Sequence, residues 1–198
     1  YSIENNKRYC NIHGYEFVTK PFDIDLTEWH GTWQKIFNIL DVLEENKYDY
    51  IFFLDTDAMI INKNIQIETL IDLLNESEHE MLIATNGLNG GELISTSGML
   101  FKNTEKIKKF FESVIEAANT KYQPKKHEHF HEQDVVNYLY KEFDDVKSLI
   151  NPVEMDILNS WWLADVEDKS RFIYHFMARS KDEKAEIAKQ LYEKHLNN

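Results

Sequence analysis

Hydrophobic residues recur every three or four positions in several stretches of this chain, which is the spacing of one face of an α-helix. The first such stretch ends at Gly14, because glycine readily adopts the left-handed conformation in which many helices end. Thr32 stands where a second stretch begins and can cap a helix through its hydroxyl group, and Thr104 begins another helix. The predicted helices cover residues 3–13, 32–45, 67–74, 104–118, 132–139 and 182–195.

Short runs of β-branched and aromatic residues separate these helices and predict strands. The predicted strands cover residues 15–18, 50–54, 81–85, 97–101, 146–150 and 172–176. The run at 50–54 has no polar alternation, which is typical of a central strand covered on both faces. The order of elements predicts an α/β fold with a mixed, mostly parallel central sheet flanked by helices.

Two acids directly follow the strand predicted over residues 50–54, namely Asp55 and Asp57. Residues two apart in an extended chain point the same way, so both carboxylates can face one ligand. Ionised carboxylates beside a hydrophobic core are costly unless a cation compensates for their lost hydration. The pair therefore indicates a site for a divalent cation, although acids also occur in the turns that end strands.

Composition narrows the functional classes. The 198 residues are 42% hydrophobic and 29% charged, as in an ordinary globular domain, and the formal net charge is -13. Such an acidic chain is poorly suited to nucleic acid or to an anionic membrane surface, both of which attract basic patches. The single cysteine, Cys10, excludes an internal disulfide, and no run of about 20 apolar residues could span a bilayer.

The sequence begins at Tyr1 with helical material, whereas an α/β nucleotide-binding domain normally begins with a strand. We therefore expect residues 1–198 to form a single catalytic domain that lacks its first strand and is incomplete at its N-terminus. No signal peptide is visible. The expected location is the cytoplasm; the alternative is the soluble catalytic domain of a Golgi or membrane-anchored enzyme whose anchor is absent here.

Several separated elements resemble, in the same order, the motifs of retaining nucleotide-sugar glycosyltransferases with the Rossmann-like GT-A fold. These elements are Trp33-x-Lys35, Asp55-x-Asp57, Glu132-Gln133-Asp134, and His175 with Lys181 six residues later. The nearest resemblance is to the galactosyl-, mannosyl- and xylosyltransferase family, with the glycogenin-like galactosyltransferases as relatives. One departure is the triplet Thr96-Ser97-Gly98, which keeps the family's glycine but has no asparagine before it.

The resemblance implies roles for particular residues. Asp55, Asp57 and His175 would bind the metal ion, and the donor would contact Lys35, Asp55, Thr96, Gly98 and Lys181. Gln133, with Glu132 and Asp134, would lie at the reacting sugar carbon. Taken without the resemblance, Lys35 could be a solvated lysine, His175 a hydrogen-bonded core residue, and the acids Glu132 and Asp134 a complement to their helix dipole.

The implied activity is transfer of a hexose or pentose from a UDP- or GDP-sugar to a glycan or other hydroxyl acceptor, with retention of configuration. Two carboxylates and an imidazole favour Mn²⁺, with Mg²⁺ as the alternative. Retention could proceed by double displacement or by a front-face route. Two other functions stay open: a metal-dependent nucleotidyltransferase or phosphohydrolase, and a catalytically silent module that binds sugar nucleotides.

Three further features have a simple and a functional interpretation. His127, His129 and His131 alternate and could bind zinc, but a solvated loop ahead of the next helix is the favoured explanation. Trp161 and Trp162 could stack on a sugar ring, although large aromatic residues are more often buried in a core. The glycine-rich residues 86–91 could form a loop at the mouth of a site or a plain connection.

Overall fold

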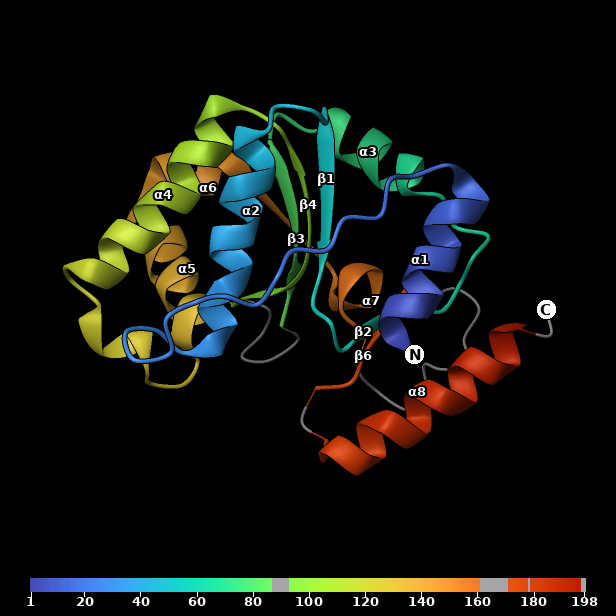
Figure 1. Cartoon of the computed structure of the whole chain (residues 1–198). Coiled ribbons are helices and arrows are strands. Elements are labelled where there is room, and N and C mark those ends of the chain that lie inside the picture. The colour runs from blue at the N-terminus through green and yellow to red at the C-terminus, as the bar shows by residue number, and fades with distance from the viewer. Residues whose placement is uncertain (87–92, 161–170, 178, 197–198) are drawn as a thin grey trace.

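A four-stranded sheet forms the centre of the computed structural model, which describes residues 1–86, 93–160, 171–177 and 179–196 (Figure 1). The strands lie in the order β1 (Tyr50–Leu54), β4 (Ile94–Lys102), β3 (Met81–Thr85) and β5 (Ile150–Val153). A second sheet pairs β2 (Ala58–Ile60) with β6 (Ile173–His175). The α/β class predicted from the sequence is confirmed.

The central sheet is mixed, as predicted, but it is not mostly parallel. Strand β4 runs antiparallel to both of its neighbours, β1 and β3, whereas β3 and β5 run parallel. Residues 86–93 alone connect β3 to β4. This connection is shorter than the dozen or more residues that a crossover between parallel strands requires, so the two strands must be antiparallel.

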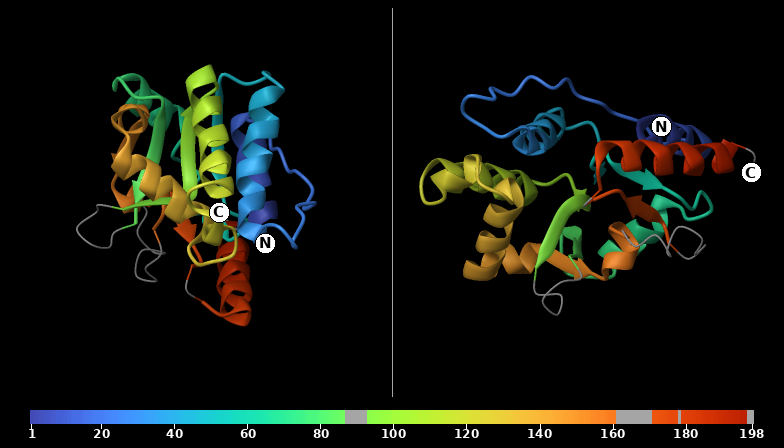
Figure 2. Two further views of the ribbon diagram at one scale, coloured as in Figure 1. Left: turned by 90° about the vertical axis from the view of Figure 1, so that its left-hand side faces the viewer. Right: turned by 90° about the horizontal axis from the view of Figure 1, so that it is seen from below.

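Helices cover both faces of the central sheet (Figure 1). One face carries α2 (Gln34–Glu44), α4 (Glu105–Asn119), α5 (His131–Glu142) and α6 (Asp144–Leu149). The other carries α1 (Ser2–His13), α3 (Ile67–Asn75) and α7 (Met155–Leu158). Figure 2 shows α2 and α4 side by side in front of the sheet. The result is a three-layer arrangement in which the sheet contributes to two hydrophobic cores.

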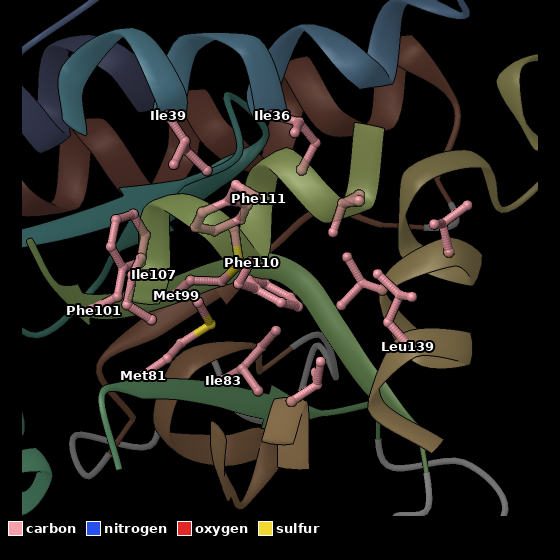
Figure 3. Packing of buried hydrophobic residues seen from close by; sticks show 14 of the residues in the cluster. Ile36, Ile39, Met81, Ile83, Met99, Phe101, Ile107, Phe110, Phe111 and Leu139 are labelled. Carbon is pink, nitrogen blue, oxygen red and sulfur yellow. The ribbon is translucent and has the colours of Figure 1, made fainter. Parts of the chain in front are cut away.

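Strands β3 and β4 supply both cores because successive side chains of a strand point to opposite faces. Met81, Ile83, Met99 and Phe101 are buried with residues of α2 and α4, such as Ile36, Ile39, Phe110 and Phe111 (Figure 3). Leu82 and Leu100 are buried on the opposite face with residues of α1, α3 and β6. A sheet packed in this way holds the ends of β1 and β4 in fixed positions.

The last helix, α8 (Lys181–Leu196), covers the small sheet rather than the central one. Its Ala188 and Leu191 form a third buried cluster with Met59 of β2, Tyr174 of β6 and Phe176. None of the helices in the described ranges has the length and hydrophobicity needed to cross a membrane.

The predicted helix ends agree with the structure at Gly14 and Thr104 but not at Thr32. Gly14 is left-handed, with φ of 77°, and the Thr104 hydroxyl accepts the Ile107 N–H at the start of α4. Thr32 instead lies within a 3-10 turn, Gly31–Trp33, in which its N–H is accepted by His30 Nδ1. A second such turn, Gln123–Lys126, precedes α5.

The strand predicted over residues 146–150 is mostly wrong, because α6 extends to Leu149 and β5 begins only at Ile150. Asp144 and Asp145 occupy the first turn of α6, where carboxylates are stabilised by the positive end of the helix dipole. Of the residues of α6, Val146 is the buried one. The sequence prediction therefore assigned a short helix with one buried apolar residue to a strand.

Two predictions about the sheet margin are also wrong. The run 50–54 does form β1, but this strand pairs only with β4 among the described strands and its residues are half-buried. Residues 15–18 form no strand, although their sequence has strand character. Both differences have one physical cause, because a strand is stabilised by backbone hydrogen bonds to a neighbouring strand. Among the described strands, none pairs with residues 15–18 and only β4 pairs with β1.

Candidate functional site

Asp55, Asp57 and His175 come together at the end of β1, with one potential ligand atom from each lying within 4.8 Å of the other two. The Asp55 N–H donates to the Ser97 carbonyl at 2.8 Å, which fixes the chain just after β1. The Phe176 N–H donates to the Asp57 carbonyl at 2.9 Å, so the pairing of β2 with β6 continues to the acids. The three residues predicted to bind metal are thus brought together by two sheets.

The imidazole of His175 is held in a defined orientation. Its Nδ1 lies 2.7 Å from Asn159 Oδ1, an oxygen that also accepts the Ser97 hydroxyl at 2.7 Å. Because a carbonyl oxygen can only accept, Nδ1 carries a proton, and the neutral ring has its lone pair on Nε2. This Nε2 lies 3.2 Å from Asp57 Oδ1.

A lone pair and a carboxylate oxygen at this separation repel each other unless a proton or a cation lies between them. A metal-binding histidine typically donates its other ring N–H to an oxygen, which sets the tautomer that binds the metal. Asn159 supplies such an oxygen from the residue after α7, and it is itself almost fully buried. The chemistry of the three side chains and the support from Asn159 fit a divalent cation.

Asp57 also has a charged neighbour that the sequence did not predict. Lys184 Nζ lies 2.6 Å from Asp57 Oδ2, while Lys181 is an exposed residue at the start of α8. Burial raises the pKa of Asp57, but His175 and Lys184 outweigh this effect and hold it well below its usual range. The carboxylate therefore stays ionised and available to a cation at neutral pH.

Lys35 joins the acid pair to a second part of the site. Its Nζ lies 2.8 Å from Asp55 Oδ1 and 3.1 Å from Glu132 Oε1, and its side chain is only 12% exposed. Burial alone would lower the pKa of Lys35, but Asp55 and Glu132 raise it well above its usual range. Lys35 is thus a permanently charged link between the end of β1 and the start of α5.

The start of α5 contacts β4 through Thr96, which lies where the sequence predicts a donor contact. The Thr96 hydroxyl donates to Glu132 Oε1 at 3.2 Å, and the Thr96 N–H donates to Gln133 Oε1 at 3.2 Å. The other Glu132 carboxylate oxygen is buried and has no hydrogen-bond partner among the residues that the structure describes. Asp134 points elsewhere, since it pairs with Lys125 at 2.8 Å.

Gly98 has a steric reason to be glycine. A Cβ atom at this position would lie 2.5 Å from the backbone oxygen of Leu158, which is far closer than real Cβ contacts. The close approach lets α7 pack against β4 and places Asn159 beside Ser97. The contact that this glycine makes possible therefore supports His175 indirectly.

The histidine-rich segment does not assemble a comparable site. Within the ranges that the structure describes, Asp55, Asp57 and His175 are the one group of three potential metal ligands that lie close enough together. His131 instead stacks on His30 with ring centroids 3.8 Å apart, and burial followed by the His30 charge lowers its pKa. Trp161, Trp162 and residues 87–91 of the glycine-rich stretch lie outside the described residues.

The architecture is that of the GT-A glycosyltransferases, as comparison with solved structures shows. A crystal structure of a glycosyltransferase involved in glycosylation of the major capsid of PBCV-1 matches with a TM-score of 0.75 and 21% identity, covering 96% of this chain and 90% of that one. The glycosyltransferase GlyE of Streptococcus pneumoniae TIGR4 matches with a TM-score of 0.55 and 13% identity, covering 91% of this chain and 46% of that one.

The family comparison points in the same direction. Residues 1–77, which include Lys35, Asp55 and Asp57, match the model of the galactosyl transferase GMA12/MNN10 family. No curated protein matches the chain. The resemblance to GT-A glycosyltransferases predicted from the sequence is confirmed, and the family match together with the fold supports a glycosyl transfer function.

Two residues of the site were missed by sequence reasoning, Asn159 and Lys184. Asn159 is an isolated amide in an irregular segment and has no sequence signal. Lys184 follows Lys181 by three residues, which places both lysines on neighbouring positions of one helix face. That spacing could have identified Lys184 as a second candidate for the same role.

Proposed function

We propose that residues 1–198 form a single catalytic domain of a metal-dependent retaining glycosyltransferase. It would transfer a hexose or pentose from a UDP- or GDP-sugar to a hydroxyl group of a glycan or other acceptor. The observation that carries this proposal is the convergence of Asp55, Asp57 and His175 beside Lys35 and Glu132. A cation site beside a second carboxylate is suited to a substrate with a diphosphate and a reacting sugar.

Asp55, Asp57 and His175 would hold the cation. Two carboxylate oxygens and one imidazole nitrogen form a mixed ligand set that suits Mn²⁺, and Mg²⁺ is the second choice. When bound, the metal would neutralise charge on the departing diphosphate. Lys184, whose ammonium group lies 2.6 Å from Asp57, and Lys181, one helical turn away, would add positive charge for the same diphosphate.

The catalytic roles are proposed for the start of α5. Gln133 is a neutral amide and a poor nucleophile, so it would stabilise positive charge on the sugar rather than bond to it. Glu132 is paired with Lys35 and accepts from Thr96, so acting as a nucleophile would cost both contacts. A front-face route therefore fits these contacts better than double displacement. Asp134 forms an ion pair with Lys125, whereas Glu132 forms one with Lys35, so the two carboxylates have different charged neighbours.

The test is release of UDP or GDP from a panel of sugar nucleotides in the presence of Mn²⁺. Asp57→Ala should reduce turnover at least about 100-fold, because a catalytic metal contributes several kcal/mol. Asp72→Ala, which changes an exposed aspartate of α3, is the matched control and should retain full activity. Turnover by Asp57→Ala at the control rate would refute the metal assignment.

The same assay separates the alternative functions through their products. On a sugar nucleotide, a nucleotidyltransferase or a phosphohydrolase breaks the diphosphate bond and releases the sugar 1-phosphate, whereas sugar transfer or donor hydrolysis breaks the bond to the sugar carbon and releases the nucleoside diphosphate. A silent module would bind a sugar nucleotide, detected by calorimetry, and release none of these products with any acceptor. Each of those outcomes would refute the proposed activity.

A further inference from the structure

Four rings gather where α2 and α5 begin. His30 precedes the turn that leads into α2, while His129 and Phe130 lead into α5 and His131 is its first residue. The imidazoles of His30 and His131 are stacked, with ring centroids 3.8 Å apart and planes inclined by only 2°. The His129 ring centroid lies 3.9 Å from that of Phe130 and 5.8 Å from that of His131. We call these four residues the ring cluster.

One side of the ring cluster is open to solvent. His30, His129 and Phe130 are exposed, whereas the fourth ring is buried. Apolar surface continues beside the cluster, because Phe22 and Leu26 are also exposed and both lie next to Gly31, the residue that follows His30. Single exposed apolar side chains are common on protein surfaces, but a group of them on one surface indicates a place where a partner or ligand binds.

Contacts between the two loops hold the ring cluster in place. The His30 N–H donates to the Lys126 carbonyl at 2.8 Å, and the Trp33 indole N–H donates to the Lys125 carbonyl at 3.2 Å. The Lys126 ammonium group also lies over the Trp29 ring, 4.1 Å from its centroid. Figure 1 shows the chain before α2 and the chain before α5 at the same end of their helical layer. A surface that is fixed in advance loses little conformational entropy on binding.

The ring cluster is continuous with the residues proposed to act on the sugar. The Gln133 N–H donates to the Phe130 carbonyl at 3.2 Å, so the exposed ring and the proposed catalytic amide belong to the same turn of chain. Lys35, in the first turn of α2, lies 3.1 Å from Glu132 in the first turn of α5. The molecule that carries the attacking hydroxyl group must lie beside the reacting sugar. A surface next to Gln133 is therefore well placed to hold that molecule.

His131 has two features that are costly in a folded protein. Its φ is 53°, in the left-handed region that residues with a side chain rarely adopt, and its buried Nδ1 has no hydrogen-bond partner in the part of the chain that the structure describes. Features of this kind concentrate at binding and catalytic sites, where the position of a side chain matters more than stability. Here that position is the stack against His30.

The chemistry of the ring cluster fits a carbohydrate. A sugar ring has a face of C–H groups, which packs against an aromatic ring, and hydroxyl groups at its edge, which form hydrogen bonds. An imidazole has the complementary surfaces, because its ring face is largely apolar and its nitrogen atoms lie at the edge. A purely apolar acceptor would leave these nitrogen atoms without partners, whereas a glycan can satisfy both surfaces.

We propose that the ring cluster is the acceptor-binding surface of this protein and that the acceptor is a carbohydrate, with one sugar ring packed against Phe130 and the exposed imidazoles. This inference rests on the proposed function, because it gives the acceptor of that reaction both a place and a chemical class.

The first test measures binding and uses neither donor nor turnover. The probes are neutral tetrasaccharides of glucose, mannose, galactose and xylose, and NMR follows the Cε1–H signals of the histidines. At least one probe should shift the signals of His30 and His129 and leave that of His13, on α1, in place. No shift with any probe would overturn the proposal. So would a shift caused by protein concentration alone, because a second copy of the chain would then be the occupant.

Two variants of α5 provide a matched comparison. Phe130 and Phe143 flank opposite ends of this helix and are 52% and 47% exposed, so neither substitution by alanine removes a core residue. Phe130→Ala should weaken binding of the tetrasaccharide about tenfold, because truncating an aromatic residue at the centre of a contact commonly costs this much. Phe143→Ala should bind as the parent does. Equal binding by the two variants would overturn the proposal.

A kinetic test separates this inference from the proposed function. With the tetrasaccharide that binds as acceptor, Phe130→Ala should raise the KM for the acceptor about tenfold and leave the KM for the sugar nucleotide nearly unchanged. An equal rise in both KM values would overturn the proposal. A parent protein that releases no nucleoside diphosphate from any sugar nucleotide would refute the proposed function, and with it the role of the bound carbohydrate as acceptor, whereas the binding measurement would stand.

Discussion

Replacing Asn159 by leucine tests whether His175 is oriented to bind a metal ion. Asn159 Oδ1 accepts from His175 Nδ1 and from the Ser97 hydroxyl, each at 2.7 Å. Leucine has a similar volume but offers no acceptor. The imidazole proton would then be free to move to Nε2, where Asp57 Oδ1 at 3.2 Å can accept it. In that tautomer Nε2 has no lone pair for a cation.

The size of the effect follows from the loss of one supporting hydrogen bond to a ligand. Such losses lower metal affinity about 10- to 100-fold, which corresponds to about 1.4 to 2.8 kcal/mol. The upper part of this range applies, because Asn159 is 1% exposed and water cannot easily replace the lost acceptor. Asn159→Asp keeps an oxygen in place and adds negative charge, so it should bind Mn²⁺ at least as tightly as the parent.

Calorimetry measures the dissociation constant of Mn²⁺ for the parent and both variants. Thermal unfolding of each metal-free protein checks that the variants are folded. Ser97→Ala removes the other donor to Asn159 while leaving its bond to His175, so it should change the affinity less than threefold. If a folded Asn159→Leu variant binds Mn²⁺ as tightly as the parent, the proposed orientation of His175 is wrong.

Two further predictions concern single contacts. Gly98→Ala should lower the free energy of unfolding by about 2 to 3 kcal/mol, the upper part of the range for overpacking, because its Cβ would meet a backbone oxygen at 2.5 Å. Gly14→Ala, strained only by its φ of 77°, should cost about 1 kcal/mol, and urea denaturation measures both. Equal losses would contradict the steric reason. Lys184→Met should raise the affinity for Mn²⁺ several-fold, measured by calorimetry without a sugar-nucleotide donor, because the Lys184 ammonium group competes with the metal ion for Asp57. Lys189→Met, which changes an exposed lysine of the same helix, is the control. An unchanged affinity for Lys184→Met would show that the ammonium group and the metal ion do not compete.

Much of the fold was accessible from the sequence because its signals are local. The apolar period of α2 and α4 and the acids after β1 depend on a few neighbouring residues, and all were located correctly to within a few positions. The motifs also identified Lys35, Asp55 and His175 as residues of one region, and the structure brings them together. Their catalytic and binding roles stay predictions.

The errors arose where structure depends on distant neighbours. The strand potential of residues 15–18 is real in sequence terms, but a strand needs a partner, and none of the described strands pairs with it. Strand β1 likewise pairs with β4 alone among the described strands and lies at the edge of the sheet, although its composition fits a central strand. Asn159 acts through a contact with His175, 16 positions away, which no spacing rule predicts. The contact of Lys184 with Asp57 spans 127 positions, and the only local signal for it is the three-residue spacing from Lys181.

The order in which this polypeptide emerges during synthesis has a consequence for the site. His175 is 118 positions from Asp57, so a growing chain exposes its paired acids long before the imidazole exists. Domains that fold during translation acquire their N-terminal contacts first. Until His175 has been synthesised, the nascent chain carries only two of the three side chains proposed to bind the metal ion.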